Sequence, residues 1–175
     1  MKNKSTICVV FVMLPLFGSC VGAVANAQLE GRSSATGQGL ENGAIPTVIT
    51  YHQLYVTPDG ETHFREIRVP LTTETTAPPA QPIAQSTLQP ATTIRHAAFP
   101  PHWGVNDRDH GVFHNASAAR FITVRQGVLW VTASDGETRR FQAGDVFEVL
   151  DVAPSKGHIT WAGEESVIML FSNHP

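Results

Sequence analysis

The sequence predicts an all-β domain of the barrel or sandwich class, on three observations. Short runs rich in β-branched and aromatic residues recur in the second half of the chain, for example Phe121-Ile122-Thr123-Val124 and Val128-Leu129-Trp130-Val131. Turn residues separate such runs every 8–12 residues or so, a spacing typical of sandwiches and barrels. No stretch keeps a convincing helical period of apolar residues. The domain is therefore expected to consist of short strands joined by turns.

The first strands are expected to form a hairpin. Thr47–Tyr51 and Leu54–Val56 are β-branched and aromatic, and Thr62–Leu71 follows as the returning strand. The intervening Thr57-Pro58-Asp59-Gly60-Glu61 is a tight-turn sequence. Later strands are predicted around the turns at Gly127, Ser134–Glu137 and Gly144-Asp145, over Phe121–Val124, Val128–Val131, Thr138–Phe141, Val146–Leu150, Ile159–Trp161 and Val167–Phe171.

Between these two groups lies Thr72–Thr93, rich in Thr, Pro, Ala and Gln, with no helix or strand period. Connections of this length are usually functional or disordered. We predict a surface excursion, the alternative being an arm that wraps the domain or reaches a second subunit.

Residues 1–27 resemble a secretory signal peptide. Lys2 and Lys4 precede the apolar run Ile7–Phe17, which is too short to span a bilayer as a finished helix. Ala25-Asn26-Ala27 then offers the small-residue pattern for cleavage before Gln28. The protein is therefore expected to be exported, to the periplasm or to the medium.

A second processing route competes with simple cleavage. Phe17-Gly18-Ser19-Cys20 is similar to a bacterial lipoprotein signal, in which Cys20 would carry a lipid anchor. Phe17 departs from the usual aliphatic residue, so we favour cleavage. Residues 28–44 then form a flexible Gly/Ser/Gln-rich leader, and residues 45–175 the folded domain.

The mature chain has no cysteine under this reading, because Cys8 and Cys20 are the only two. No disulfide is expected despite export. Without Lys2 and Lys4, 10 basic residues face 15 acidic ones, a net charge of −5. This balance argues against nucleic acid or an anionic membrane surface as a partner.

The order of turns from Gly127 to His158 resembles that of the cupins, a family of small barrels. Strand and hairpin sequences lead to Gly144-Asp145, a further strand, a turn with Pro154, and then Gly157-His158. The resemblance extends over Thr47–Phe171. It implies a cupin-like jelly-roll, or double-stranded β-helix, barrel and a homodimer.

The first metal motif of the cupins is degenerate in this chain. Counting back from Gly127 places Arg120 at the carboxylate position, Ala116 at the second His position and His114 at the first; His158 matches the last His. Cupins hold iron, manganese, nickel or zinc with three imidazoles and one carboxylate. Two of these four ligands remain, His114 and His158.

Other histidines could complete a metal site, with His63 and His110 as the candidates beside His114 and His158. Arg120, however, brings a permanent positive charge to the carboxylate position. That charge repels a cation and suits an anionic ligand such as a carboxylate.

A largely apolar pocket with a few polar anchors is the usual form of a small-molecule site. We predict one at the barrel mouth, with His114, Arg120, His158 and Trp103 contacting the ligand and Phe113 and Phe121 beside them. Glu148 and Asp151, by contrast, are predicted to lie on a solvated edge.

Three functions are compatible with the sequence. The first is binding of a small organic, possibly anionic, molecule in the barrel. The second is a metal-dependent enzyme of the oxygenase or isomerase type acting on a small molecule. The third is an interaction or structural role at the cell envelope through the long Thr/Pro segment. The sequence names neither ligand nor reaction, because such barrels serve many activities.

Overall fold

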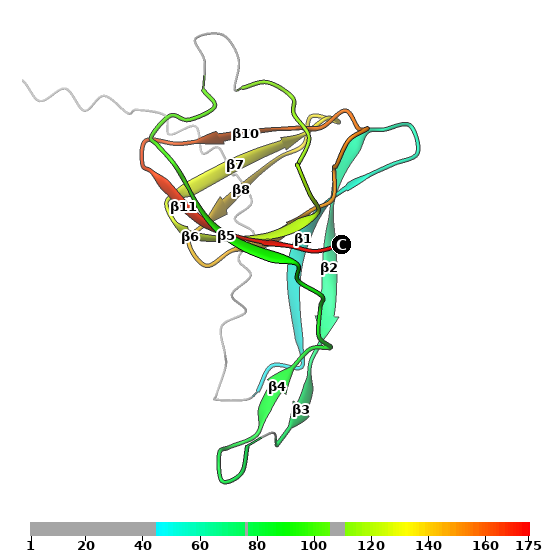
Figure 1. Ribbon diagram of the computed structural model, residues 1–175, viewed down its shortest axis with the longest axis vertical. Helices are drawn as coiled ribbons and strands as arrows, with labels where there is room; N and C mark the ends of the chain where they lie inside the picture. The colour runs from blue at the N-terminus through cyan, green and yellow to red at the C-terminus, as the bar shows by residue number, and fades with distance from the viewer. Residues whose placement is uncertain (1–44, 76, 106–110) are drawn as a thin grey trace, which may run out of the picture. The chain divides into compact units, whose positions relative to one another are not determined.

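A computed structural model describes residues 45–75, 77–105 and 111–175 (Figure 1). Within these ranges the chain forms eleven strands and no helix, which confirms the predicted all-β class. The described part accordingly contains no helix that could cross a membrane. The predicted signal peptide with Cys20, the predicted leader and His110 lie outside the described residues.

Two sheets of different size form the jelly-roll-type framework. The larger has the order β2-β1-β9-β6-β11-β5, and the smaller β10-β7-β8. Among the strand pairs of the described residues, β1–β9 alone is parallel. The strands are β1 (Val48–Val56), β2 (Thr62–Pro70), β5 (Thr93–Phe99), β6 (Arg120–Gln126), β7 (Val128–Ala133), β8 (Thr138–Gln142), β9 (Val146–Val149), β10 (His158–Ala162) and β11 (Val167–Asn173).

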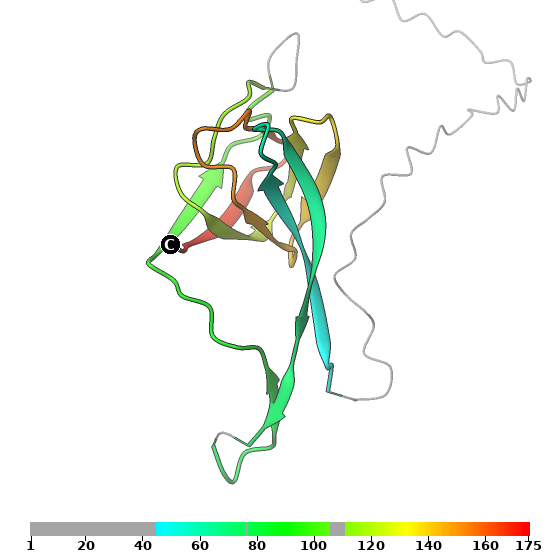
Figure 2. The same ribbon diagram turned by 90° about the vertical axis from the view of Figure 1, so that its right-hand side faces the viewer.

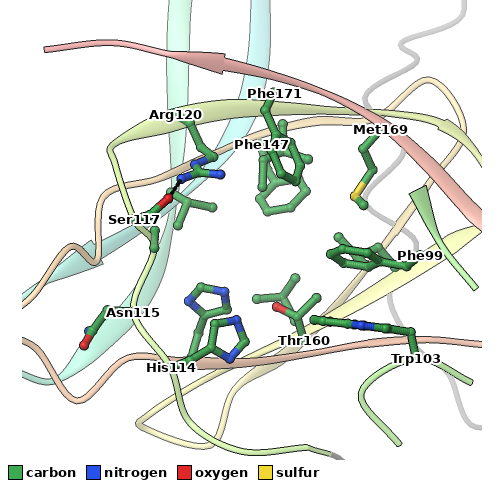
Figure 3. A pocket seen from close by; sticks show the side chains of 16 residues that line it. Phe99, Trp103, His114, Asn115, Ser117, Arg120, Phe147, Thr160, Met169 and Phe171 are labelled. Carbon is green, nitrogen blue, oxygen red and sulfur yellow. Dashed lines mark hydrogen bonds between the residues drawn. The ribbon is translucent and has the colours of Figure 1, made fainter. Parts of the chain in front are cut away.

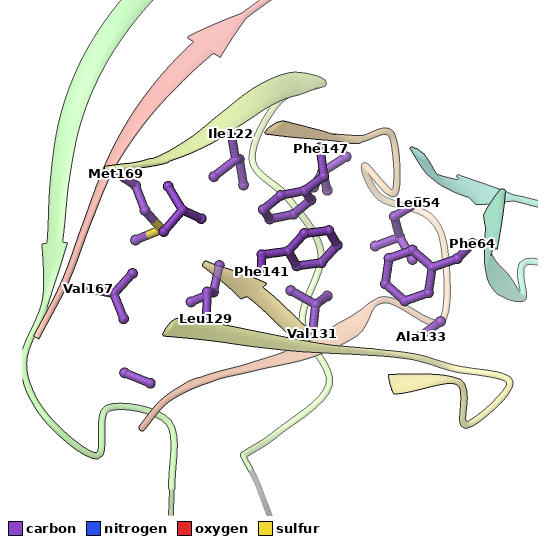
Figure 4. Close-up of a cluster of buried hydrophobic side chains, with 13 residues drawn as sticks. Leu54, Phe64, Ile122, Leu129, Val131, Ala133, Phe141, Phe147, Val167 and Met169 are labelled. Carbon is purple, nitrogen blue, oxygen red and sulfur yellow. The ribbon is translucent and has the colours of Figure 1, made fainter. Parts of the chain in front are cut away.

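Alternation along the strands sends one set of side chains into a shared core. On β7, Leu129, Val131 and Ala133 are buried while their neighbours are partly exposed, as expected for a strand with one covered face. Phe141 of β8 stacks on Phe147 of β9 at 3.9 Å between ring centroids. Full burial of such a ring contributes about 1.5–3 kcal/mol. Figure 4 shows this core, to which both sheets contribute.

The segment Thr72–Thr93 departs from the prediction that it has no strands. It contains β3 (Thr72–Glu74) and β4 (Ile83–Gln85), which pair as a separate two-stranded sheet (Figure 2). Thr93 begins β5, which pairs with β11 at the edge of the large sheet. These strands are short and mostly exposed, so the apolar alternation on which the prediction relied is missing. These segments become strands because they hydrogen-bond to a neighbouring strand.

The predicted turn at Gly127 is confirmed, and the residue is required there. Its φ is +75°, and a Cβ would lie 2.4 Å from the carbonyl oxygen of Ser166. Only glycine accommodates both the left-handed backbone and this close approach. The turn therefore fixes how β6 passes into β7, and with it the directions in which Arg120 and Leu129 point.

Candidate functional site

A cavity of about 230 Å³ lies between the two sheets (Figure 3). Its wall has a polar side with His114, Ser117 and Arg120, and an apolar side with Phe99, Trp103 and Met169 (Figure 3). The remaining lining residues are Asn115, Ala116, Ile122, Leu129, Val131, Phe147, Val149, His158, Thr160 and Phe171. Trp103, His114 and Ser117 are also exposed to solvent, so the cavity opens on their side.

The structure brings four of the predicted site residues to this one cavity: Trp103, His114, Arg120 and His158. His63 is not among the lining residues; its Nδ1 lies 2.6 Å from Oδ2 of Asp135. The three residues chosen from the motif spacing, His114, Arg120 and His158, thus line the same cavity.

Two aromatic residues expected at the mouth do not line the cavity. Phe121 instead packs against Tyr51 and His174, with ring centroids 5.4 and 5.3 Å away. Successive side chains of a strand point to opposite faces, so Phe121 turns away when Arg120 and Ile122 point inward. Phe113 is exposed and also lies off the cavity wall.

A backbone bridge holds His114 beside His158. The two residues exchange N–H···O bonds of 2.9 Å in both directions, and their ring centroids are 4.5 Å apart. Gly157, with φ +77°, makes this approach feasible, because a Cβ there would lie 2.5 Å from the carbonyl oxygen of His114. A glycine that the sequence suggested as a turn residue thus also sets the distance between the two imidazoles.

Both imidazoles are held through Nδ1. Nδ1 of His114 lies 3.0 Å from the carbonyl oxygen of Val112, which can only accept, so this nitrogen carries the hydrogen. Nδ1 of His158 lies 2.6 Å from Oδ2 of Asp151. An ionised carboxylate likewise only accepts, so in a neutral ring held this way the lone pair lies on Nε2.

The prediction that Glu148 and Asp151 lie on a solvated edge is wrong. Glu148 is 6% exposed and Asp151 is 0% exposed. The strand pattern contained the missing information for Asp151, because it has the parity of the buried Phe147 and Val149. Asp151 continues that inward row one step past the end of β9, and there it meets His158.

Arg120 reaches the cavity wall with only neutral partners. Its Nε donates to the carbonyl oxygen of Ala118 over 3.0 Å, and its Nη2 donates to Oγ of Ser117 over 2.6 Å. The guanidinium carbon lies 5.0 Å from the ring centroid of Phe171. Across the part of the chain that the structure describes, no carboxylate forms an ion pair with Arg120.

The surroundings of Arg120 disfavour its own charge. Burial lowers the pKa of its guanidinium below the ordinary value, and the like charge of Arg95 lowers it further, while Asp151 acts in the opposite direction. An arginine remains charged under all ordinary conditions. The site therefore presents a cation whose charge is incompletely balanced by the described protein groups.

The described residues do not fit the metal set that the family resemblance implies. In residues 45–75, 77–105 and 111–175, no three His, Cys, Asp or Glu side chains converge on a point. Of the predicted ligands that the structure describes, only His114 and His158 lie side by side, and Arg120 occupies the sequence position expected for the carboxylate. A tightly bound iron, manganese, nickel or zinc ion stays an untested prediction.

No protein-family model matches the chain, and no curated protein matches it significantly. The site must therefore be interpreted from its own geometry.

Proposed function

We propose that this protein binds a small organic anion in the cavity, with a carboxylate of the ligand at Arg120. The observation that carries the proposal is the guanidinium on the cavity wall without a carboxylate partner among the described residues. Two of its five N–H donors are used by Ala118 and Ser117, so three remain for a ligand. Planar pairing with a carboxylate is the interaction for which a guanidinium is best suited.

The size of the cavity limits the ligand. A volume of about 230 Å³ falls below the ~300–1,000 Å³ range of sites for drug-sized molecules. It corresponds to roughly eight waters at ~30 Å³ each. We therefore expect a metabolite with a handful of carbon atoms rather than a nucleotide or an oligosaccharide.

The apolar side of the cavity would take the hydrocarbon part of such an anion. Phe99 and Trp103 stack at 3.8 Å between ring centroids with an angle of 19°, and Met169 lies beside them (Figure 3). A ligand with a carboxylate at one end and a short apolar group at the other would match both sides. Burial of the apolar group would add affinity in proportion to its area.

The proposal includes three predictions from the sequence: membership of a cupin-like family, export through the signal peptide, and a homodimer. Under them the protein would bind its ligand outside the cytoplasm. A soluble form is favoured over one anchored through Cys20.

The test is a thermal-unfolding screen of the mature protein with 2-oxobutanoate, phenylacetate and the neutral analogue phenylacetamide. A ligand that binds only the folded state raises the melting temperature. We expect the two anions to do so and the amide to have little effect. Arg120→Gln should abolish the shift, while Arg125→Gln, an exposed arginine on the same strand, should preserve it. Equal shifts in both variants would refute the proposal.

A further inference from the structure

The pair Asp151–His158 is placed as an acid–base unit and not as a surface ion pair. Asp151 is 0% exposed, and its Oδ2 accepts the Nδ1 hydrogen of His158 over 2.6 Å. Its other oxygen, Oδ1, has no hydrogen-bond partner within the described residues. A buried carboxylate in this position orients the imidazole and stabilises its protonated form when a proton arrives.

Nε2 of His158 is the ring nitrogen left for a ligand, because Nδ1 contacts Asp151. His158 lines the cavity and Asp151 does not, so the ring edge bearing Nδ1 is turned to the protein. With the hydrogen on Nδ1, Nε2 holds a lone pair and can accept a proton. The neighbouring His114 ring, 4.5 Å away, contributes a second acceptor at the same wall.

A base and an anion site therefore share one small apolar chamber. Arg120 would hold a carboxylate through its remaining N–H donors, and those same donors face any negative charge that develops beside the carboxylate. Preorganised donors aimed at developing charge are an effective means of lowering a barrier. The two features together fit removal of a proton from a carbon acid.

We propose that His158, positioned by Asp151, is a general base that abstracts a proton from C3 of a small 2-oxo carboxylate bound at Arg120. This inference rests on the proposed anion site. A 2-oxo acid has the carboxylate that Arg120 would bind, a carbonyl that acidifies the adjacent C–H bonds, and a short chain for the apolar side.

The step is balanced without any oxidant or metal. The C3–H bond breaks and its proton moves to Nε2 of His158. The electron pair forms a C2=C3 double bond, and the carbonyl π pair moves to the oxygen as an enolate facing Arg120. Return of a proton to C3 restores the keto acid, and its delivery to oxygen yields the enol. The predicted activity is keto–enol tautomerisation.

The experiment follows proton NMR loss of the C3 signal of 2-oxobutanoate in D₂O with the mature protein, alongside its melting shift with the same compound. We expect saturable exchange above the buffer rate. His158→Gln and Asp151→Asn should slow exchange by about 100-fold or more, the usual contribution of a general base, while retaining the melting shift. Arg120→Gln should lose both.

The chain supplies a matched control pair. His63 and Asp135 are joined by the same 2.6 Å contact but do not line the cavity, so His63→Gln and Asp135→Asn should leave exchange unchanged. A melting shift without exchange would overturn the base and leave the anion site standing. If neither the melting shift nor the exchange is observed, the anion site and the general base are both refuted. Normal exchange in a folded His158→Gln variant would exclude His158 as the base.

A second measurement does not depend on turnover or on the folding of a variant. Long-range ¹H–¹⁵N correlation spectra of the parent protein report which ring nitrogen carries the hydrogen in each histidine. We expect the neutral His158 ring to carry it on Nδ1. A hydrogen on Nε2 instead would remove the lone pair from the cavity side and would contradict the proposal.

Discussion

Tyr51 on β1 donates its hydroxyl hydrogen to the carboxylate of Glu148 on β9 over 3.2 Å. Burial, followed by this carboxylate, raises the pKa of Tyr51 to about 12. The same carboxylate oxygen accepts from Nε2 of the buried Gln53. A polar centre thus links β1 to β9, the parallel pair of the large sheet.

Glu148→Ala should destabilise the fold through this centre. The change leaves the Gln53 amide and the Tyr51 hydroxyl without their acceptor, and an unsatisfied buried polar group costs about 1–3 kcal/mol. Urea unfolding would measure the loss. Glu164→Ala, at an exposed position, should stay within about 0.5 kcal/mol of the parent, and an equally small effect of Glu148→Ala would contradict the assigned role.

Gly157→Ala should be much more damaging than Gly136→Ala. Both glycines have a positive φ, so both substitutions carry a left-handed backbone penalty of about 1–2 kcal/mol. Only at Gly157 would the new Cβ also meet backbone, 2.5 Å from the His114 carbonyl oxygen, whereas nothing lies within 4 Å at Gly136. We expect Gly157→Ala to lose the ligand-induced melting shift as well. Similar melting temperatures for the two variants would show that the His114–His158 bridge is not tight.

Stability should fall as the pH drops below 6.5 because of His52. Burial lowers its pKa below the ordinary value of 6.5, and the positive charge of Arg139 lowers it further. The unfolded chain then binds the proton more readily than the folded one, so protonation favours unfolding from about pH 6.5 down through the lower folded value. Above about pH 6.5 this loss of stability is absent.

His52→Gln provides the test, because the glutamine side-chain oxygen can still accept a hydrogen bond from Arg139 and a glutamine side chain does not titrate. Urea midpoints at pH 7.5 and 5.5 should differ less in this variant than in the parent. An identical pH dependence in the two proteins would exclude His52 as the source.

Arg120→Met should separate function from stability. The substitution keeps an apolar stem against Phe171 but removes a charge that burial disfavours. Replacing a buried charge by an apolar side chain of similar length is often neutral or stabilising. We expect an unchanged or higher unfolding midpoint together with loss of anion binding, and a large drop in stability would indicate a structural role for Arg120.

Metal content is a further prediction that distinguishes the competing functions. With no three ligands converging in the described part of the chain, we expect elemental analysis of tag-free protein to find well under one metal ion per chain. Near-stoichiometric iron, manganese, nickel or zinc that disappears in His114→Ala would instead favour the metal-dependent enzyme.

The local pattern of the sequence was sufficient for most strands. β6 to β11 follow from β-branched and aromatic runs between glycine turns, because apolar alternation reports burial of one face directly. β3, β4 and β5 were not predicted because they are mostly exposed and lack an alternation of apolar residues, and their existence depends on pairing with another strand. Propensity contains no information about such pairing.

For the site, the sequence determined the chemistry available and the tertiary structure decided its arrangement. Motif spacing and strand parity identified Arg120, His114 and His158. Two features depend on the fold. They are the 2.6 Å contact of His158 with Asp151 and the position of Arg120 on the cavity wall without a carboxylate partner in the described chain. Parity along one strand is local, whereas the meeting of side chains from β6, β10 and the segment after β9 depends on how two sheets pack across a common core.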